Sequence, residues 1–183
     1  MAKYSKLENN SEVMDVLYAI VLENKSQKEI VRKLKQKRST VSSKIWFLKK
    51  NKVIKKERWN FYPDWDNIYK KMLNALDDIL DHYISIARNL EQDPSKELLK
   101  IKKNTDAFFT KETLSGILKV YSLIYFYGYE KLSMRDMIYS FLNQLRKVND
   151  RRIKRIDPKL LNIKKVISEI PMREELLFDR LLD

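Results

Sequence analysis

Apolar residues recur every three or four positions in three successive stretches of the N-terminal third of the chain, the last ending near residue 48. This period predicts three amphipathic helices, because residues three or four apart share one face of a helix. The second and third helices are expected to cross at a small shared core. The residues assigned to that core are Ile30, Leu34, Val41, Ile45 and Leu48.

Polar residues mark where the first two helices begin. Ser26 is followed three residues later by Glu29, and Asn9 is followed at the same spacing by Glu12. This spacing predicts capping boxes, in which the two side chains bind the unpaired backbone N–H groups of the first turn. We therefore expect one helix to begin after Asn9 and to end near Glu23, and the next to begin after Ser26.

The pattern changes from helix to strand after residue 51. Val53-Ile54 and Trp59–Tyr62 are expected to form two short strands around the charged turn Lys55–Arg58. Pro63 is expected to end the second strand, because proline cannot donate to a strand ladder. Asp64 can then cap the helix that follows.

A long helix is predicted over residues 64–92. Its apolar residues are separated by three or four positions, a rhythm close to a heptad seam. We interpret this seam as a dimerisation surface. Its members are Trp65, Ile68, Met72, Leu76, Ile79, Tyr83, Ala87 and Leu90.

Four more helical regions are expected after the long helix. One begins at Pro94, one is capped by Thr110 and closes at Gly128, one is capped by Ser133, and the last opens at Asp157. The chain of 183 residues contains only two glycines and four prolines, so little interrupts helix formation. We therefore predict a mainly α fold, with an N-terminal domain over residues 1–63 and an α-helical domain over residues 64–183.

Basic residues are concentrated in one segment. The formal net charge is +13, and residues 25–58 alone hold 11 Lys and 3 Arg against two Glu, a net charge of +12. Lysines that only solvate a surface would be spread along the chain, whereas a concentrated patch is typical of a protein that binds a polyanion. A merely basic surface is the alternative interpretation.

The basic segment also carries a recognisable pattern. Residues 26–34 read S-Q-K-E-I-V-R-K-L and residues 39–45 read S-T-V-S-S-K-I, followed by Leu48 and by the apolar pair at 53–54. Over roughly residues 10–64 this resembles the winged helix-turn-helix of prokaryotic, archaeal-like transcription regulators of the ArsR and MarR type. The resemblance implies three helices plus a short β-hairpin wing.

The chain departs from the family pattern at its turns. Val31 stands where alanine is usual in the first helix of the motif. Lys35, Gln36 and Lys37 replace a glycine, an apolar residue and a capping serine, and Lys52 replaces the glycine before the first strand. We expect these turns to be built differently.

The resemblance implies that the outer face of the third helix enters the major groove, while the hairpin follows the backbone or enters the minor groove. Arg38 can fork onto guanine, Thr40 reaches a phosphate, and Trp46 is a further candidate on the same face. The candidate DNA-binding residues are Ser26, Gln27, Lys28, Lys37, Arg38, Ser39, Thr40, Ser42, Ser43, Lys44, Lys55, Lys56 and Arg58.

Other chemistry has little support in the sequence. The absence of cysteine excludes disulfides and thiolate sites, and the single histidine, His82, lies one helical turn from Asp78. Such a pair could hold a metal, but a solvated acidic face is the more ordinary interpretation. No nucleophile–base pair or glycine-rich phosphate loop is present. We expect no catalytic residues, no metal and no cofactor, and predict that the protein is not an enzyme.

Two further clusters are ambiguous. Aromatic residues between Tyr121 and Tyr129 are expected to pack in a helical core, with a ligand pocket or a protein interface as the alternative. Basic residues between Arg151 and Arg155 form either a second phosphate-binding patch or a solvated helix end. A small-molecule or protein effector on the helical domain therefore stays open.

Together these patterns predict a sequence-specific transcriptional regulator that binds double-stranded DNA as a homodimer. Two-fold symmetry would place two recognition helices about 34 Å apart on one face of the duplex. The alternatives are an architectural or replication-associated DNA-binding protein and a protein-interaction module. No apolar run approaches a membrane span of roughly 18 residues, and the N-terminus lacks a signal-peptide pattern, so we expect a cytoplasmic protein without a membrane partner.

Overall fold

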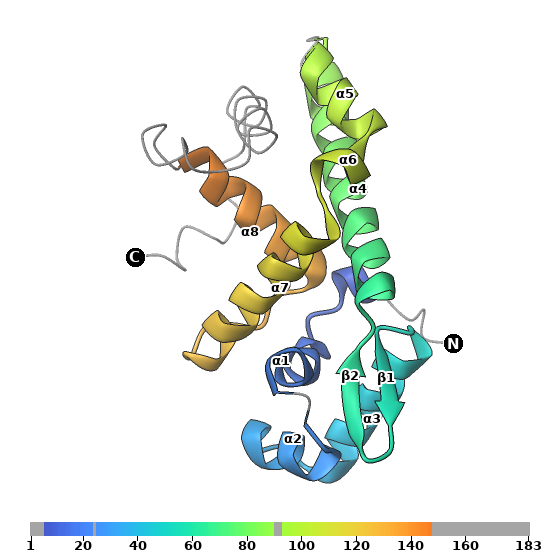
Figure 1. Ribbon diagram of the computed structural model, residues 1–183. Coiled ribbons are helices and arrows are strands. Elements are labelled where there is room, and N and C mark those ends of the chain that lie inside the picture. Colours follow the sequence, from blue (N-terminus) through green and yellow to red (C-terminus); the bar gives the residue numbers. More distant parts are fainter. Residues whose placement is uncertain (1–5, 24, 90–92, 148–183) are drawn as a thin grey trace, which may run out of the picture.

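The computed structural model describes residues 6–23, 25–89 and 93–147, and it is mainly helical with one small antiparallel sheet (Figure 1). This confirms the prediction of a mainly α chain. The elements in order are η1 (Leu7–Asn9), α1 (Met14–Glu23), α2 (Gln27–Leu34), α3 (Arg38–Lys50), β1 (Ile54–Glu57), β2 (Asn60–Pro63), α4 (Trp65–Asn89), α5 (Lys96–Lys103), α6 (Thr105–Phe108), α7 (Lys111–Phe126) and α8 (Met134–Lys147).

Helix α1 is buried on all its faces. Every residue from Met14 to Val21 lies in the core, including Asp15, Tyr18 and Ala19 outside the predicted apolar stripe. A helix buried all round is a central element rather than a surface element. It packs against α2, α3 and β2 on one side and against α7 on another (Figure 1).

The core is continuous from the N-terminal helices to α8. The cluster of buried apolar residues includes Leu17 of α1, Leu48 of α3, Leu76 of α4, Leu118 of α7 and Leu142 of α8. The two predicted domains therefore share buried side chains through α1. The boundary at residue 63 stays a prediction.

The start of α1 differs from the predicted capping box. Asn9 ends the short helix η1, and the side chain of the next residue, Asn10, accepts the backbone N–H of Glu12 at 2.9 Å. An asparagine that binds a backbone group two residues on forms a tight turn of its own. The helix consequently begins at Met14, and the prediction that Asn9 and Glu12 cap it is wrong.

The second predicted capping box is present. The carboxylate of Glu29 accepts the backbone N–H of Ser26 at 2.9 Å and its hydroxyl at 2.8 Å. These hydrogen bonds hold the pKa of Glu29 below its ordinary value, with the Ser26 hydroxyl as the largest cause. The carboxylate thus satisfies the first turn of α2 in its charged form.

The hairpin is longer than the sequence predicted. Lys55–Glu57 belong to β1 rather than to a turn, and the register pairs Ile54 with Pro63 and Glu57 with Asn60. Only residues 58 and 59 form the turn, where Arg58 takes a φ of 53°. Two-residue hairpin turns need positive φ, and this backbone requirement outweighs the polar character that favoured a longer turn.

Two lysines occupy backbone conformations that usually favour glycine. Lys35 ends α2 at φ 52°, and Lys52 follows α3 at φ 57°. The backbone N–H of Val53 then reaches the carbonyl of Leu48 at 3.1 Å, which closes the end of α3. The left-handed turns are therefore retained without glycine, at a conformational cost to each lysine.

The long helix predicted over 64–92 is confirmed within the described residues. Asp64 caps it by accepting the backbone N–H of Asn67 at 3.2 Å, and the helix runs to Asn89. Residues 90–92 of the prediction lie outside the described part of the chain.

The seam of α4 is buried within the same chain. Ile68, Met72, Leu76, Ile79 and Tyr83 are each no more than 1% exposed. Helix α4 packs against η1, α5, α6, α7 and α8, and these elements account for the apolar face. The heptad-like spacing of apolar residues indicates that one face of the helix is buried. It does not indicate whether the same chain or a second chain buries that face. The interpretation of this seam as a dimerisation surface is therefore wrong.

The later helices begin close to their predicted caps. Thr110 and Ser133 accept backbone N–H groups three residues on, and Gly128 takes a φ of 102°. Pro94, however, precedes its helix, because Ser95 caps α5 through the N–H of Leu98. The helical region predicted from Asp157 and the basic residues 151–155 lie outside the described residues.

No helix in the described part of the chain is both long and apolar enough to cross a lipid bilayer.

Replacing Lys52 with glycine is expected to raise the free energy of unfolding by about 1 kcal/mol, because glycine adopts positive φ without a Cβ clash. Lys49→Gly removes the same side chain from the exposed last turn of α3 and is expected to lower it by about 1 kcal/mol. Urea denaturation measures both. A Lys52→Gly variant no more stable than the parent would contradict the strained turn.

Candidate nucleic-acid interface

Helices α2 and α3 meet as the apolar spacing predicted. Ile30, Val41 and Leu48 are fully buried, Ile45 is nearly so, and Leu34 packs half-buried beside them. This small core fixes which face of α3 is turned inward. The opposite face is left on the surface.

The outward face of α3 carries short polar side chains. Arg38, Ser39, Thr40, Ser42 and Ser43 are all exposed. Trp46 continues this face with 54% of its surface exposed, and with Ser42 and Ser43 it lines a shallow hollow. Short hydroxyl side chains allow another molecule to approach the helix closely, and a tryptophan ring adds an apolar contact.

The start of α2 is tied to this face. The side-chain amide of Gln27 donates to the hydroxyl of Ser42 at 2.5 Å. Lys28 is exposed one residue further on, and Lys37 is exposed at the start of α3. Ser26 is held at the cap and pairs with Asn60 of β2 through an isolated bridge. These two contacts fix the start of α2 relative to both α3 and the hairpin.

The hairpin presents the second group of predicted residues. Lys55, Lys56 and Arg58 are exposed, and Lys55 pairs with Glu57 at 3.4 Å. Exposed ion pairs of this kind contribute little energy, so these side chains can exchange partners.

The structure adds Trp59 to the interface residues. It is 82% exposed at the hairpin turn, and the ammonium of Lys56 lies 5.7 Å from its ring centroid. Sequence analysis assigned Trp59 to a strand and gave it no role. A tryptophan between Arg58 and Asn60, in a polar turn, was the signal that could have marked it.

Lys44 is placed differently from the other candidate residues. Its side chain is 13% exposed, and its ammonium lies 2.6 Å from a carboxylate oxygen of Asp15 and 3.0 Å from the side-chain oxygen of Gln36. The charge of Lys44 is thus balanced inside the protein. We do not include Lys44 in the interface.

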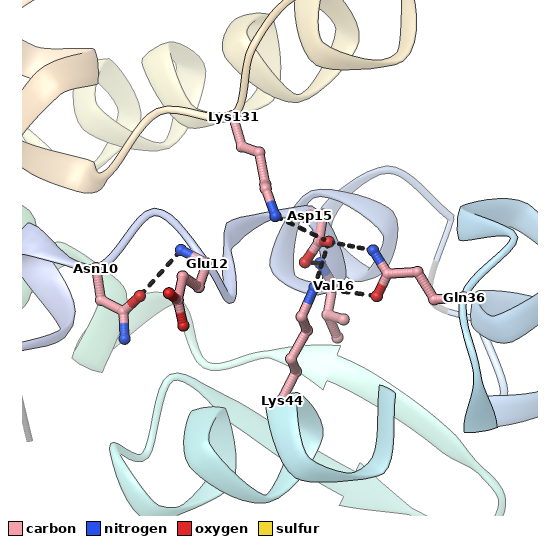
Figure 2. A network of polar contacts seen from close by, with 7 residues as sticks. All are labelled: Asn10, Glu12, Asp15, Val16, Gln36, Lys44 and Lys131. Carbon is pink, nitrogen blue, oxygen red and sulfur yellow. Dashed lines mark hydrogen bonds and ion pairs between the residues drawn. The ribbon is translucent and has the colours of Figure 1, made fainter. Parts of the chain in front are cut away.

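Asp15 is a fully buried carboxylate with several partners (Figure 2). Besides Lys44, it accepts the side-chain amide of Gln36 at 2.7 Å and the backbone N–H of Val16 at 2.8 Å. Lys131, between α7 and α8, lies 3.6 Å away. A buried charge is tolerated only when it is paired and hydrogen-bonded, so Asp15 ties α1 to α3, to the turn before α3, and to the α7–α8 loop. Its sequence signal was a single acidic residue inside an apolar run.

Helix α2 is also fixed to its neighbours on its far side. Lys33 pairs with Glu23 of α1, and the same ammonium lies 4.1 Å from the ring centroid of Phe126 in α7. Lys25 pairs with Glu23 at 3.2 Å. The pKa of Glu23 is lowered, mainly by its hydrogen bond to Lys33. Lys33 thus holds α2 against α1 and α7, whereas Lys28 and Lys37 are exposed.

The acidic cluster on α4 contacts a lysine. Lys102 lies 3.3 Å from Asp77 and 2.9 Å from Asp81, while Asp78 and His82 stand beside them on the helix. Within residues 6–23, 25–89 and 93–147, no group of three or more metal-ligating side chains lies close enough to hold an ion.

The aromatic run divides between core and surface. Tyr121 donates to Ser140 at 2.6 Å, and the Tyr125 ring lies 5.3 Å from that of Tyr18 and 5.0 Å from that of Phe126. In contrast, Tyr127 and Tyr129 are exposed.

Comparison of the chain with models of protein families, with curated proteins and with solved structures finds no match.

Lys44→Met is expected to lower the free energy of unfolding by roughly 3 kcal/mol, because it leaves the buried Asp15 carboxylate short of a charge partner. Lys49→Met, at an exposed position of the same helix, should change stability by less than about 0.5 kcal/mol. Urea denaturation distinguishes the two. Equal midpoints would show that the Asp15–Lys44 contact contributes nothing.

Proposed function

We propose that α2, α3 and the β1–β2 hairpin form a winged helix-turn-helix that binds double-stranded DNA, and that the protein regulates transcription. One observation carries the proposal. Nearly all of the net charge, +12 of +13, falls within residues 25–58, which fold into the two helices and hairpin with the exposed polar face. A cationic surface built on a projecting helix is suited to the major groove.

The exposed residues divide into two roles. Lys28, Lys37, Lys55 and Lys56 supply point charges around the face, which suits contacts with phosphates. Arg38 lies in the first turn of α3, where a guanidinium can donate two hydrogen bonds to the edge of guanine. We assign backbone positioning to the lysines and base reading to Arg38.

The hairpin acts as the wing in this proposal. Arg58 and Trp59 form its tip, and both are exposed. A cationic side chain at the tip can enter the neighbouring minor groove, whose negative potential attracts it. The backbone bridge between Ser26 and Asn60 supports this geometry, because it fixes the hairpin relative to α2.

Sequence-specific regulation is favoured over an architectural role by the composition of the α3 face. Ser42, Ser43 and Trp46 are uncharged, and such side chains contact base edges and thymine methyl groups rather than phosphates alone. Cations at these positions would instead favour contacts with the phosphate backbone, which carry no sequence information. Binding of all duplexes with equal affinity would assign the architectural or replication-associated role instead.

A homodimer remains part of the proposal on geometric grounds alone. One short recognition helix contacts few base pairs, and a two-fold symmetric dimer contacts twice as many. The surface used is not the α4 seam, because that face is covered within the chain. Sedimentation equilibrium of the full chain tests the stoichiometry.

Arg38→Ala is expected to cost about 1–3 kcal/mol of binding free energy on a duplex selected from a random library, with little loss on random duplex. The loss of a base contact lowers the affinity for the selected duplex more than the affinity for random duplex, because only the selected duplex presents the matching base. Fluorescence anisotropy of the two labelled duplexes gives both affinities. The same loss on selected and random duplex would remove the base-reading role of Arg38.

Lys55→Ala combined with Lys56→Ala is expected to weaken binding to both duplexes about equally and to flatten the salt dependence by about two phosphate contacts. Lys100→Ala combined with Lys103→Ala is the matched control, because it removes two exposed lysines from α5, outside the proposed interface. The same measurements apply. If the control pair weakens binding as much, only net charge matters and the wing has no specific role.

A further inference from the structure

A cavity of about 280 Å³ lies on the α7 side of α1. Its walls come from three helices and the loop between α7 and α8, and they are mostly aromatic rings and aliphatic groups. Among the residues that form them are Tyr18, Val120, Tyr121, Ile124, Leu132 and Phe141. This cavity is separate from the basic face on α3 and the hairpin, and none of its walls comes from residues 25–58.

The buried polar atoms in these walls already have partners. The hydroxyl of Tyr18 donates to the carbonyl of Leu132 at 2.9 Å, and that of Tyr121 donates to Ser140 at 2.6 Å. Burial raises the pKa of both phenols, so they stay neutral. In the described part of the chain, no buried side-chain polar atom lacks a hydrogen-bond partner. At its buried part, an occupant of the cavity therefore meets satisfied polar groups and gains most from apolar contact.

The size and opening of the cavity limit what can enter. A dry protein cavity of roughly 150 Å³ accepts benzene, so a space of about 280 Å³ admits an aromatic molecule of two rings. Val120 and Tyr129 line the cavity and are 53% and 43% exposed, so it communicates with solvent.

We propose that this cavity is a binding site for a small, uncharged aromatic molecule of about two rings. Tyr18, Tyr121 and Phe141 supply ring contacts from α1, α7 and α8 respectively. Gln144 and Glu130 also line the cavity and are the groups able to orient a polar substituent.

Occupancy of the cavity also affects α3. Glu130 and Leu132 line the cavity, and Lys131 between them lies 3.6 Å from the Asp15 carboxylate. That carboxylate holds Lys44 of α3 at 2.6 Å (Figure 2). A ligand that shifts the α7–α8 loop moves Lys131 relative to Asp15. The change in the contacts of Asp15 then alters the position of α3. This coupling rests on the proposed function.

Binding of 6-propionyl-2-(dimethylamino)naphthalene, a dye of two fused rings, to the full chain tests the site. The uncharged dye is excited directly and is expected to brighten with saturable, one-to-one binding. Val120→Trp should weaken it at least fivefold by filling the cavity mouth. Leu123→Trp is the matched control, because Leu123 is 49% exposed on the same helix but does not line the cavity.

The comparison can be repeated on α8. Gln144 lines the cavity, and its half-buried neighbour Asn143 does not. Gln144→Trp should therefore weaken dye binding at least fivefold, and Asn143→Trp should leave it unchanged. Circular dichroism establishes that each variant is folded. The absence of saturable binding, or equal affinity within both pairs, would overturn the site.

Duplex DNA affinity tests the coupling. A saturating concentration of the dye is expected to change the affinity of the parent chain for duplex at least threefold. For Val120→Trp, the dye concentration that gives half of the change should be at least fivefold higher. Unchanged affinity in the parent would overturn the coupling while the dye site stands. Failure to bind duplex without dye would instead overturn the proposed function and the coupling together, and dye binding would still decide the site.

Discussion

The burial of α1 on every face is the constraint on which the rest of the structure depends. A helix with no solvent-facing side needs neighbours all round, and both halves of the chain supply them: α2, α3 and the hairpin on one side, α7 on another. The polar face of α3 can project because its inner face has this support to pack on. The N-terminal helices and the later helices are consequently one packed body, in which α1 is shared.

Asp15, the buried acidic residue of α1, fixes the relative positions of the elements packed around the helix. Apolar burial is not directional, whereas Asp15 requires its partners at hydrogen-bond distance. It fixes Lys44 of α3, Gln36 of the preceding turn and Lys131 of the α7–α8 loop around one carboxylate. The same network pairs Lys44 inside the protein, whereas Lys28, Lys37 and Arg38 stay exposed. Some lysines of this segment are thus paired within the fold, as Lys44 and Lys33 are, and others are exposed and available to the proposed function.

The sequence predicted local structure well where one short-range interaction decides it. The capping box at Ser26, the crossing core around Val41 and the long α4 helix are examples. It failed where the deciding partner lies far away in sequence. The α4 seam reads the same whether α7 and α8 or a second chain covers it, and Asp15 cannot be paired with Lys44 from spacing. Lys55–Glu57 and Trp59 were misassigned because the backbone, not the polarity of the side chains, sets the two-residue turn.

The measurement that tests the central claim most directly is binding of the full chain to labelled duplex DNA from its own upstream region and to random duplex, titrated over salt. Each phosphate neutralised contributes about −0.9 to the slope of log K against log salt concentration. The account predicts a steep slope together with a clear preference for the upstream duplex. The absence of binding to either duplex at low salt would contradict it, and the basic face would then serve another partner.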